Sequence, residues 1–325
     1  MNKLFTSIIL CAVCLGCSIQ PESPNGMISM QTDGEQVCIM YDGQPVLDIA
    51  SVGIRTSATG EGMAFQGISK TGRVSEEYQM LAGKTLSCSN EANEYVLKYK
   101  DINGKPVRLV FRLYNDGVAF RYELSGLEGE TLVDENTVYR IPEGTGRWMQ
   151  RWTEAYEDFF PYSTTGKGSR RSQHWGYPAL IEPSEGIFTL ITEAGISREH
   201  SGSSLKNETD LEDYKVCPAA NDLVLNGEWE TPWRLAIIGE LGDIVESTLV
   251  TDVSEPCRIE DTSWIEPGVV SWIYWAHNHG SKDFQIVKEY IDMAVALGLP
   301  YVLIDAEWDE MGNGGNIGDA LAYAK

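Results

Sequence analysis

The sequence predicts a large antiparallel β-sandwich followed by the beginning of a parallel α/β domain. From residue 27 to about residue 250, apolar and polar residues mostly alternate in short runs separated by turn residues, as in strands with one buried face. From residue 269 the spacing changes to strand, helix, strand, helix. Residues 252–268 between the two patterns contain two prolines and several acids, which is typical of a linker. A chain of 325 residues also favours two domains over one.

Residues 27–251 are assigned to the sandwich domain. The clearest stretch is "YVLKYKDINGKPVRLVFRLYNDGVAFRYEL" (95–124), where apolar residues alternate with polar ones. The sequences Asn103-Gly104 and Asn115-Asp116-Gly117 interrupt it, and such residues adopt a positive φ at little cost. We therefore expect a three-stranded meander here, and a further pair of strands around Asp42-Gly43.

Residues 269–325 are predicted to fold as βαβα. "VVSWIYWA" (269–276) and "YVLID" (301–305) are continuous apolar runs, as expected of strands buried on both faces. A short βαβ crossover requires the two strands to be parallel. The helix between them has an apolar stripe, a start at Ser281 or Asp283, and an end at Gly298 followed by Pro300. The stripe is formed by Phe284, Val287, Ile291 and Ala294, widened by Ile286, Tyr290 and Leu297.

Polar and aromatic residues follow both predicted strands. Asp305 to Asp309 come after the second strand and Trp275 to His279 after the first. Since functional side chains of parallel sheets gather at the carboxyl ends of the strands, we expect these two groups to be neighbours.

The first residues resemble an export signal. Lys3 precedes a short apolar run that is too short to span a membrane, and the run ends at "LGCS" (15–18). This end resembles the lipobox of bacterial lipoproteins, although Cys14 stands where leucine is usual, so ordinary cleavage remains an alternative. We expect residues 1–17 to be a signal peptide, residues 18–26 a tether, and Cys17 a possible lipid anchor. The expected location is the periplasm or the outer membrane of a Gram-negative bacterium.

Composition excludes some partners. A net charge of −23 opposes binding to nucleic acid or to an anionic membrane surface, both of which attract Lys and Arg. Nine tryptophans are compatible with sugar binding, because a pyranose stacks on a flat ring, and equally with an ordinary core. The cysteines after the leader match no zinc pattern and fit either disulfides or thiols. They are Cys38, Cys88, Cys217 and Cys257.

Several stretches of the chain together resemble glycoside hydrolase family 97. They are "YNDGVAFRY" (114–122), "ITEAGI" (191–196), "PWRLAIIG" (232–239), "PGVVSWIYW" (267–275) and "EYIDMAVALGLPYVLIDAEW" (289–308). The resemblance implies a β-super-sandwich, a catalytic (β/α)8 barrel and a C-terminal sheet domain. It also implies hydrolysis of α-linked sugars at non-reducing ends of an oligosaccharide substrate, with calcium in the active site. "VSWIYW" and "IDAEW" resemble the retaining, α-galactosidase-like branch more than the inverting α-glucosidases.

The sequence departs from the family in length. A complete barrel needs about 250 residues, and fewer than sixty follow the linker, enough for the first two βα units. The nucleophile and the acid/base of the family lie on later strands, so we expect the catalytic residues beyond Lys325. On this interpretation the chain is an N-terminal fragment with an incomplete barrel, and it is inactive by itself.

Asp305 is the foremost candidate for substrate binding, because it is expected at the carboxyl end of the second strand. The resemblance implies that an acid here accepts hydrogen bonds from sugar hydroxyls; the alternative is a structural cap of the following turn. Trp272, Trp275 and Trp308 are candidate platforms or pocket walls. Alternation along the strand places Trp272 and Trp275 on opposite faces, so at most one of them faces the interior.

The resemblance also implies that the sandwich lends one glutamate to the calcium site, in a Tyr-Glu context. Glu157 in "RWTEAYEDFFPY" (151–162) matches best, then Glu154, with Glu193 in "ITEAGI" weaker. One glutamate cannot hold calcium, which takes several oxygen ligands, and the others are expected from the missing barrel. A solvated loop acid is the alternative for each.

Two other functions stay open from the sequence. His277 and His279 form an HxH pair that could bind a divalent metal in a barrel hydrolase, although His277 could instead contact substrate. The sandwich could also act alone, as a carbohydrate-binding lipoprotein without catalysis.

Overall fold

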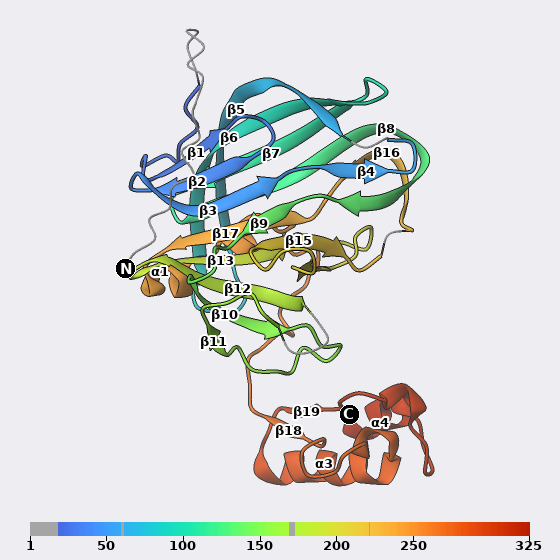
Figure 1. Cartoon of the computed structure of the whole chain (residues 1–325). Coiled ribbons are helices and arrows are strands. Elements are labelled where there is room, and N and C mark those ends of the chain that lie inside the picture. Colours follow the sequence, from blue (N-terminus) through green and yellow to red (C-terminus); the bar gives the residue numbers. More distant parts are fainter. Residues whose placement is uncertain (1–18, 60–61, 169–172, 221) are drawn as a thin grey trace. The chain divides into compact units, whose positions relative to one another are not determined.

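The computed structural model describes residues 19–59, 62–168, 173–220 and 222–325 (Figure 1). The chain divides into two compact units, residues 1–257 and 258–325. The predicted signal peptide and Cys17 lie outside the described residues. In the part of the chain that is described, no helix combines the length and the apolar character needed to cross a membrane.

The first unit is built from strands β1 to β17 with two short helices after the last strand. The strands are β1 Ile28–Thr32, β2 Val37–Tyr41, β3 Gln44–Ser51, β4 Ile54–Thr56, β5 Met63–Gln79, β6 Ser87–Asp101, β7 Pro106–Tyr114, β8 Gly117–Glu135, β9 Val138–Arg140, β10 Gly146–Arg151, β11 Tyr162–Ser163, β12 His174–Ser184, β13 Ile187–Ala194, β14 Ser203–Lys206, β15 Asp213–Pro218, β16 Val224–Glu230 and β17 Trp233–Gly239. The helices are α1 Leu241–Glu246 and α2 Leu249–Asp252.

The strand pairings of this unit are antiparallel, as the alternation predicted. β6, β7 and β8 form the expected meander, in which Leu97 pairs with Leu109 and Phe111 with Phe120. Figure 1 shows a layer that contains β5 to β8 above a layer that contains β12, β13 and β15. The main core joins the two layers and includes Phe111 and Phe120 from the first and Ile181 from the second. The prediction of an antiparallel sandwich is therefore confirmed.

Two of the three predicted turns have the expected positive φ, whereas Asn115, Asp116 and Gly117 between β7 and β8 have none. Asp42 and Gly43 join β2 to β3 with φ values of 45° and 75°, the left-handed pair of a tight hairpin. Gly104 has a φ of 81° in the turn between β6 and β7.

The end of the first unit differs from the sequence expectation, which placed only strands here and began a linker at residue 252. Leu249 of α2 and the following Val253 are buried in a second core with Leu235 and Ile237 of β17. β17 is therefore covered on both faces. Each helix has at most six residues, too few to give a helical period in the sequence.

The second unit contains β18 Val270–Trp272, the 3-10 turn η1 Gly280–Lys282, α3 Phe284–Leu297, β19 Tyr301–Leu303, the 3-10 turn η2 Trp308–Glu310 and α4 Ile317–Ala324. α3 has the predicted ends. The Asp283 side chain accepts hydrogen bonds from the backbone N–H groups of Gln285 and Ile286, and Gly298 ends the helix with a φ of 68°. Its buried residues are the predicted Phe284, Val287, Ile291 and Ala294, whereas Leu297 is exposed.

β18 and β19 are parallel neighbours, with Trp272 paired to Leu303, as predicted. Both strands are shorter than expected. The prediction that they are buried on both faces is wrong: Tyr301 and Leu303 are 36% and 45% exposed. Val302 and Ile304 pack with the core around α3, so only the face that carries them is covered.

Candidate functional site

Asp305 follows β19 and is fixed at three atoms. Its backbone N–H donates to the hydroxyl of the buried Ser281 at 2.9 Å. Its Oδ1 accepts from the backbone N–H of Ala306 at 2.6 Å, and its Oδ2 accepts from the indole Nε1–H of Trp272 at 2.7 Å. The bond to Ala306 is the turn cap that was the structural alternative for this residue. Each carboxylate oxygen still has acceptor capacity, since an ionised carboxylate offers about four lone-pair positions.

Asp305 lies on the face of the two strands that is turned away from α3. Tyr301 and Leu303 of β19 are exposed on this face, while Val302 and Ile304 pack on the helix side. Asp305 lies just beyond the strand, and its bond to Trp272 places its carboxylate on the exposed side. Trp272 is on the same face as Asp305, because Ser271 and Ile273 on either side of it are buried and Ser271 hydrogen-bonds to the Tyr290 carbonyl of α3.

Trp275 contacts Trp272 and does not lie on the opposite side. The two ring centroids are 4.7 Å apart, with the planes at 48°. The expectation of opposite faces is wrong because β18 ends at Trp272 and Trp275 is in the turn that follows. Trp275 is 85% exposed, so one ring rests on its neighbour and leaves most of its surface open. Trp308 opens η2 and is half exposed.

His277 and His279 do not share a partner. The His277 ring lies edge-on to Tyr290 at 5.8 Å, and His279 Nδ1 is 2.6 Å from Oε2 of Glu307. Within the described ranges, no group of three or more His, Cys, Asp or Glu side chains is placed to hold a metal ion. The four described cysteines are free thiols.

Glu307 joins the loops that follow the two strands, and sequence reasoning missed it as a functional candidate. Its Oε1 is 3.0 Å from Lys282 Nζ, and the contacts with His279 and Lys282 lower the pKa of its carboxyl group. His279 and Glu307 have φ values of 59° and 69°, which are uncommon for residues with a side chain. The only signal in the sequence was the position of Glu307 among the acids after the second strand.

The candidate calcium residues of the sandwich lie in different environments. Glu154 and Glu157 are exposed in the segment between β10 and β11, next to the exposed ring of Tyr156. Glu193 is largely buried and ion-paired with Arg234. Its Oε1 accepts from the Ser203 N–H at 2.8 Å and its Oε2 from the Ser203 hydroxyl at 2.6 Å. The structure therefore gives Glu193 an internal role and leaves Glu154 and Glu157 accessible.

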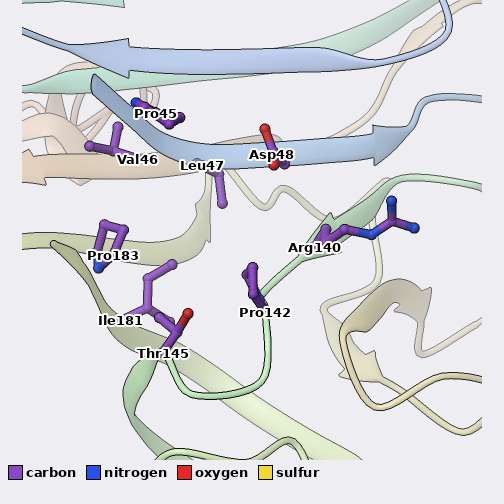
Figure 2. A pocket seen from close by; sticks show the side chains of 9 residues that line it. All are labelled: Pro45, Val46, Leu47, Asp48, Arg140, Pro142, Thr145, Ile181 and Pro183. Atoms are coloured by element: carbon purple, nitrogen blue, oxygen red, sulfur yellow. The ribbon is translucent and has the colours of Figure 1, made fainter. Parts of the chain in front are cut away.

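The sandwich also has a small hollow between β3 and β12 (Figure 2). Figure 2 shows the Arg140 guanidinium extending away from it, and this group pairs with Asp213. The hollow contains mainly apolar groups, which gives no catalytic arrangement. It is lined by Pro45, Val46, Leu47, Asp48, Arg140, Pro142, Thr145, Ile181 and Pro183.

Comparison with known families decides the affiliation of the chain. Residues 22–256 match the family model described as Glycosyl-hydrolase 97 N-terminal. The chain belongs to glycosyl-hydrolase family 97. The matched residues correspond closely to the first compact unit, so the antiparallel sandwich is the N-terminal domain of this family.

Two curated relatives are similar to most of the chain. The chain is 30% identical to the "Probable retaining alpha-galactosidase" of Streptomyces bingchenggensis (strain BCW-1), over 89% of this chain and 44% of the relative. It is 25% identical to the "Retaining alpha-galactosidase" of Bacteroides thetaiotaomicron (strain ATCC 29148), over 95% of this chain and 53% of the relative. The chain spans about half the length of these relatives.

Solved structures show the same fold at lower identity. The crystal structure of a beta-arabinopyranosidase superposes with a TM-score of 0.77 and 24% identity, over 94% of this chain and 53% of that one. A family 97 enzyme from Pseudoalteromonas sp. strain K8, in complex with acarbose, gives a TM-score of 0.76 and 18% identity, over 94% and 52%. These matches extend beyond residues 22–256, so the aligned fold includes part of the second unit.

Proposed function

We propose that the chain is the N-terminal part of an exo-acting, retaining glycoside hydrolase that cleaves α-linked sugars of an oligosaccharide, with α-galactosides preferred over α-glucosides. The family affiliation makes it a glycoside hydrolase, and both curated relatives carry the name retaining alpha-galactosidase. The observation in the structure that supports the proposal best is the position of Asp305. Its carboxylate follows a parallel strand, on the face away from α3 and beside two tryptophans.

The second unit is proposed to be the first quarter of a (β/α)8 barrel. The order β18, α3, β19, α4 and the parallel pairing of the strands support this. In such a barrel the helices are outside, so the strand face away from α3 becomes the interior. Asp305 and Trp272 would then face the substrate, and the exposed Tyr301 and Leu303 would be covered by the facing strands.

The proposed mechanism uses two carboxylates from later strands, beyond Lys325. One attacks the anomeric carbon and the other protonates the leaving oxygen, which requires the two carboxyl groups to be about 5 Å apart in a retaining enzyme. Asp305 accepts hydrogen bonds from sugar hydroxyls and takes no part in the covalent step. The 325-residue chain on its own is proposed to be inactive, because it lacks that pair.

Calcium is proposed as the cofactor of the complete enzyme, where it would supply Lewis-acid chemistry to the sugar. Glu157, with Glu154 as the second choice, is an exposed hard-oxygen donor and fits as one ligand. The residues present do not form a complete site, since calcium takes six to eight oxygens. Glu193 is the weakest candidate because Arg234 and Ser203 already occupy both of its oxygens.

Export is also part of the proposal. The apolar leader and the "LGCS" sequence support a periplasmic or outer-membrane protein, with contact to the membrane only through a lipid on Cys17. Mass spectrometry of the N-terminus after expression in a Gram-negative host tests this. An N-terminal Cys17 that carries lipid supports the anchor, a free N-terminus after residue 17 supports plain cleavage, and an intact Met1 contradicts export.

The test of the function is an assay of the full-length protein with aryl α-galactoside and aryl α-glucoside, followed by NMR of the first-formed product. We expect faster turnover of the galactoside and a product with the α configuration. A β product would contradict retention. Faster cleavage of the glucoside would contradict the preference. Sugar binding with neither substrate cleaved would favour the non-catalytic binding protein, and the 325-residue chain should cleave neither substrate.

A further inference from the structure

We propose that Trp272 is a positioning residue for substrate binding: its indole N–H holds the Asp305 carboxylate in the orientation that accepts the sugar hydroxyls. This inference rests on the proposed function and extends it. The sequence suggested a stacking platform for Trp272, whereas the contact with Asp305 gives its indole nitrogen a different task.

The contact is a charge-assisted hydrogen bond of 2.7 Å from Trp272 Nε1 to Asp305 Oδ2. Indole nitrogen is only a donor, so the interaction requires an acceptor such as the carboxylate and fixes which oxygen is engaged. Hydrogen bonds to an ionised group are about twice as strong as neutral ones. The Trp272 bond is therefore strong enough to select one side-chain orientation of Asp305.

The rest of the surroundings immobilises the pair. Asp305 is held at its backbone by Ser281, which is buried, and at Oδ1 by the Ala306 N–H. Trp272 pairs with Leu303 in the parallel ladder, and the Trp275 ring covers it at 4.7 Å. A carboxylate that is fixed before the substrate arrives loses less side-chain entropy on binding, which is the benefit of preorganisation.

The two tryptophans accordingly have different roles. Trp272 is only partly exposed and its indole N–H is bonded to Asp305, so it acts on substrate binding by orienting the Asp305 carboxylate. Trp275 is 85% exposed and remains the ring that is available to a sugar face.

A double-mutant cycle in the full-length enzyme tests the inference. Trp272→Phe keeps an aromatic ring and removes the donor, and we expect kcat/KM for the preferred aryl glycoside to fall about tenfold, the scale of one hydrogen bond to a charged group. In the Asp305→Asn background the same substitution should cause little further loss, because its effect depends on the carboxylate. Trp264→Phe is the matched control; Trp264 is 67% exposed in the segment before β18, and kcat/KM should not change.

A second measurement uses the 325-residue chain and does not depend on activity. With ¹⁵N-labelled tryptophan, the indole signal that disappears in Trp272→Phe is the Trp272 signal. It should exchange slowly with solvent in the wild type, and both shift and exchange faster in Asp305→Ala, while the Trp264 signal stays in place.

The outcomes separate the two proposals. The positioning role would be overturned if the losses in kcat/KM caused by Trp272→Phe and Asp305→Asn were additive. It would also be overturned if Asp305→Ala changed neither the shift nor the exchange rate of the Trp272 indole signal. A wild-type enzyme that cleaves no α-glycoside would overturn the proposed function, and the indole signal would then decide the Trp272–Asp305 contact on its own.

Discussion

Arg234 of β17 and Glu193 of β13 face each other as register partners and form an ion pair inside the sandwich. The same guanidinium also binds both oxygens of Glu135, with contacts of 3.0 Å and 2.6 Å. Arg234 is 2% exposed, Glu135 1% and Glu193 9% as side chains. One buried cation is therefore shared by two carboxylates. Burial by itself would lower the pKa of the guanidinium, but the interactions with Glu135, Tyr177 and Glu193 outweigh this and raise the pKa above its already high value.

The first prediction is that Arg234→Met destabilises the sandwich by about 3–5 kcal/mol, because it leaves the buried Glu135 and Glu193 without a positive charge beside them. Arg140→Met is the matched control. Arg140 pairs with Asp213 at the surface, with side chains 43% and 26% exposed, and removal of such a pair costs about 0.2–1 kcal/mol. Urea unfolding of the 325-residue chain measures both. Equal losses in the free energy of unfolding for the two variants would show that the buried Arg234 ion pairs contribute no more to stability than a surface pair.

The second prediction concerns two tyrosines of the main core that are both fully buried. The Tyr122 hydroxyl accepts from the Gly53 N–H at 2.7 Å and lies 3.0 Å from the Thr137 hydroxyl. The Tyr139 hydroxyl finds no hydrogen-bond partner among the described residues. We expect Tyr122→Phe to destabilise the protein by about 1–3 kcal/mol, since it leaves the Gly53 N–H unpaired. Tyr139→Phe should be neutral or stabilising, and a clear loss in urea unfolding would reveal an unrecognised partner.

The third prediction is a pH dependence of the second unit. His279 and then Lys282 lower the pKa of Glu307 below its ordinary value. A carboxyl group with a lowered folded pKa adds stability above its unfolded pKa, and this stability disappears as the pH falls through the folded value. Thermal unfolding should show Glu307→Gln less stable than wild type at pH 6. The difference should shrink as the pH falls below the ordinary glutamate pKa of about 4.3 and vanish only below the lowered pKa of the folded protein. Glu310→Gln is the comparison: it contacts only Lys282 among these groups and is 62% exposed, so its effect should be smaller.

The fourth prediction applies to the complete enzyme. Asp305→Asn should lower kcat/KM roughly ten- to a hundredfold, because a hydrogen bond to a charged group is worth about 1.5–3 kcal/mol. The fold should persist, since the side chain lies at a loop and not in a core. Azide should not restore activity, because no covalent bond forms at this carboxylate. Unchanged kinetics would show that the contacts of Asp305 are purely structural, and rescue of an inactive variant by azide would make Asp305 the nucleophile.

The fifth prediction tests the metal. In the full-length enzyme, removal of calcium with a chelator should abolish activity, and Glu157→Gln should raise the calcium concentration needed to restore it. Glu154→Gln should have less effect, although both side chains are exposed in the same segment. A larger effect of Glu154→Gln would make Glu154, and not Glu157, the better candidate for the calcium ligand. Full activity in the presence of the chelator would contradict a role for calcium.

The elements that the sequence predicts best are those with strong local patterns. The buried residues of α3 repeat at helical spacing between an Asp283 cap and the Gly298 stop, and the structure has the same boundaries and core. The Asp42-Gly43 hairpin was equally readable, because few residue pairs accept two positive φ values in succession.

The contacts within the candidate site could not be predicted from local sequence patterns. Trp272 and Trp275 are in contact because β18 ends after three residues. A continuous run of apolar residues in the sequence does not show at which residue the strand pairing stops. The pairing of His279 with Glu307 depends on two backbone conformations that neither residue type favours. Arg234 looked like one polar residue in an apolar strand, since the partners that allow its burial come from β8 and β13.

The pairing of β8 with β17, in which Phe120 meets Arg234, has a consequence for the speed of folding. β8 and β17 are far apart in the chain and must come together before this part of the sheet can form. The same holds for β3, which pairs with β9. Sheets with such non-local pairing fold in milliseconds to seconds, slower than domains built from local contacts. During synthesis the meander β6–β7–β8 emerges long before the strand that completes it. The newly made chain therefore stays unfolded for longer, which would favour the export proposed above, because passage through a membrane channel requires a chain that has not yet folded.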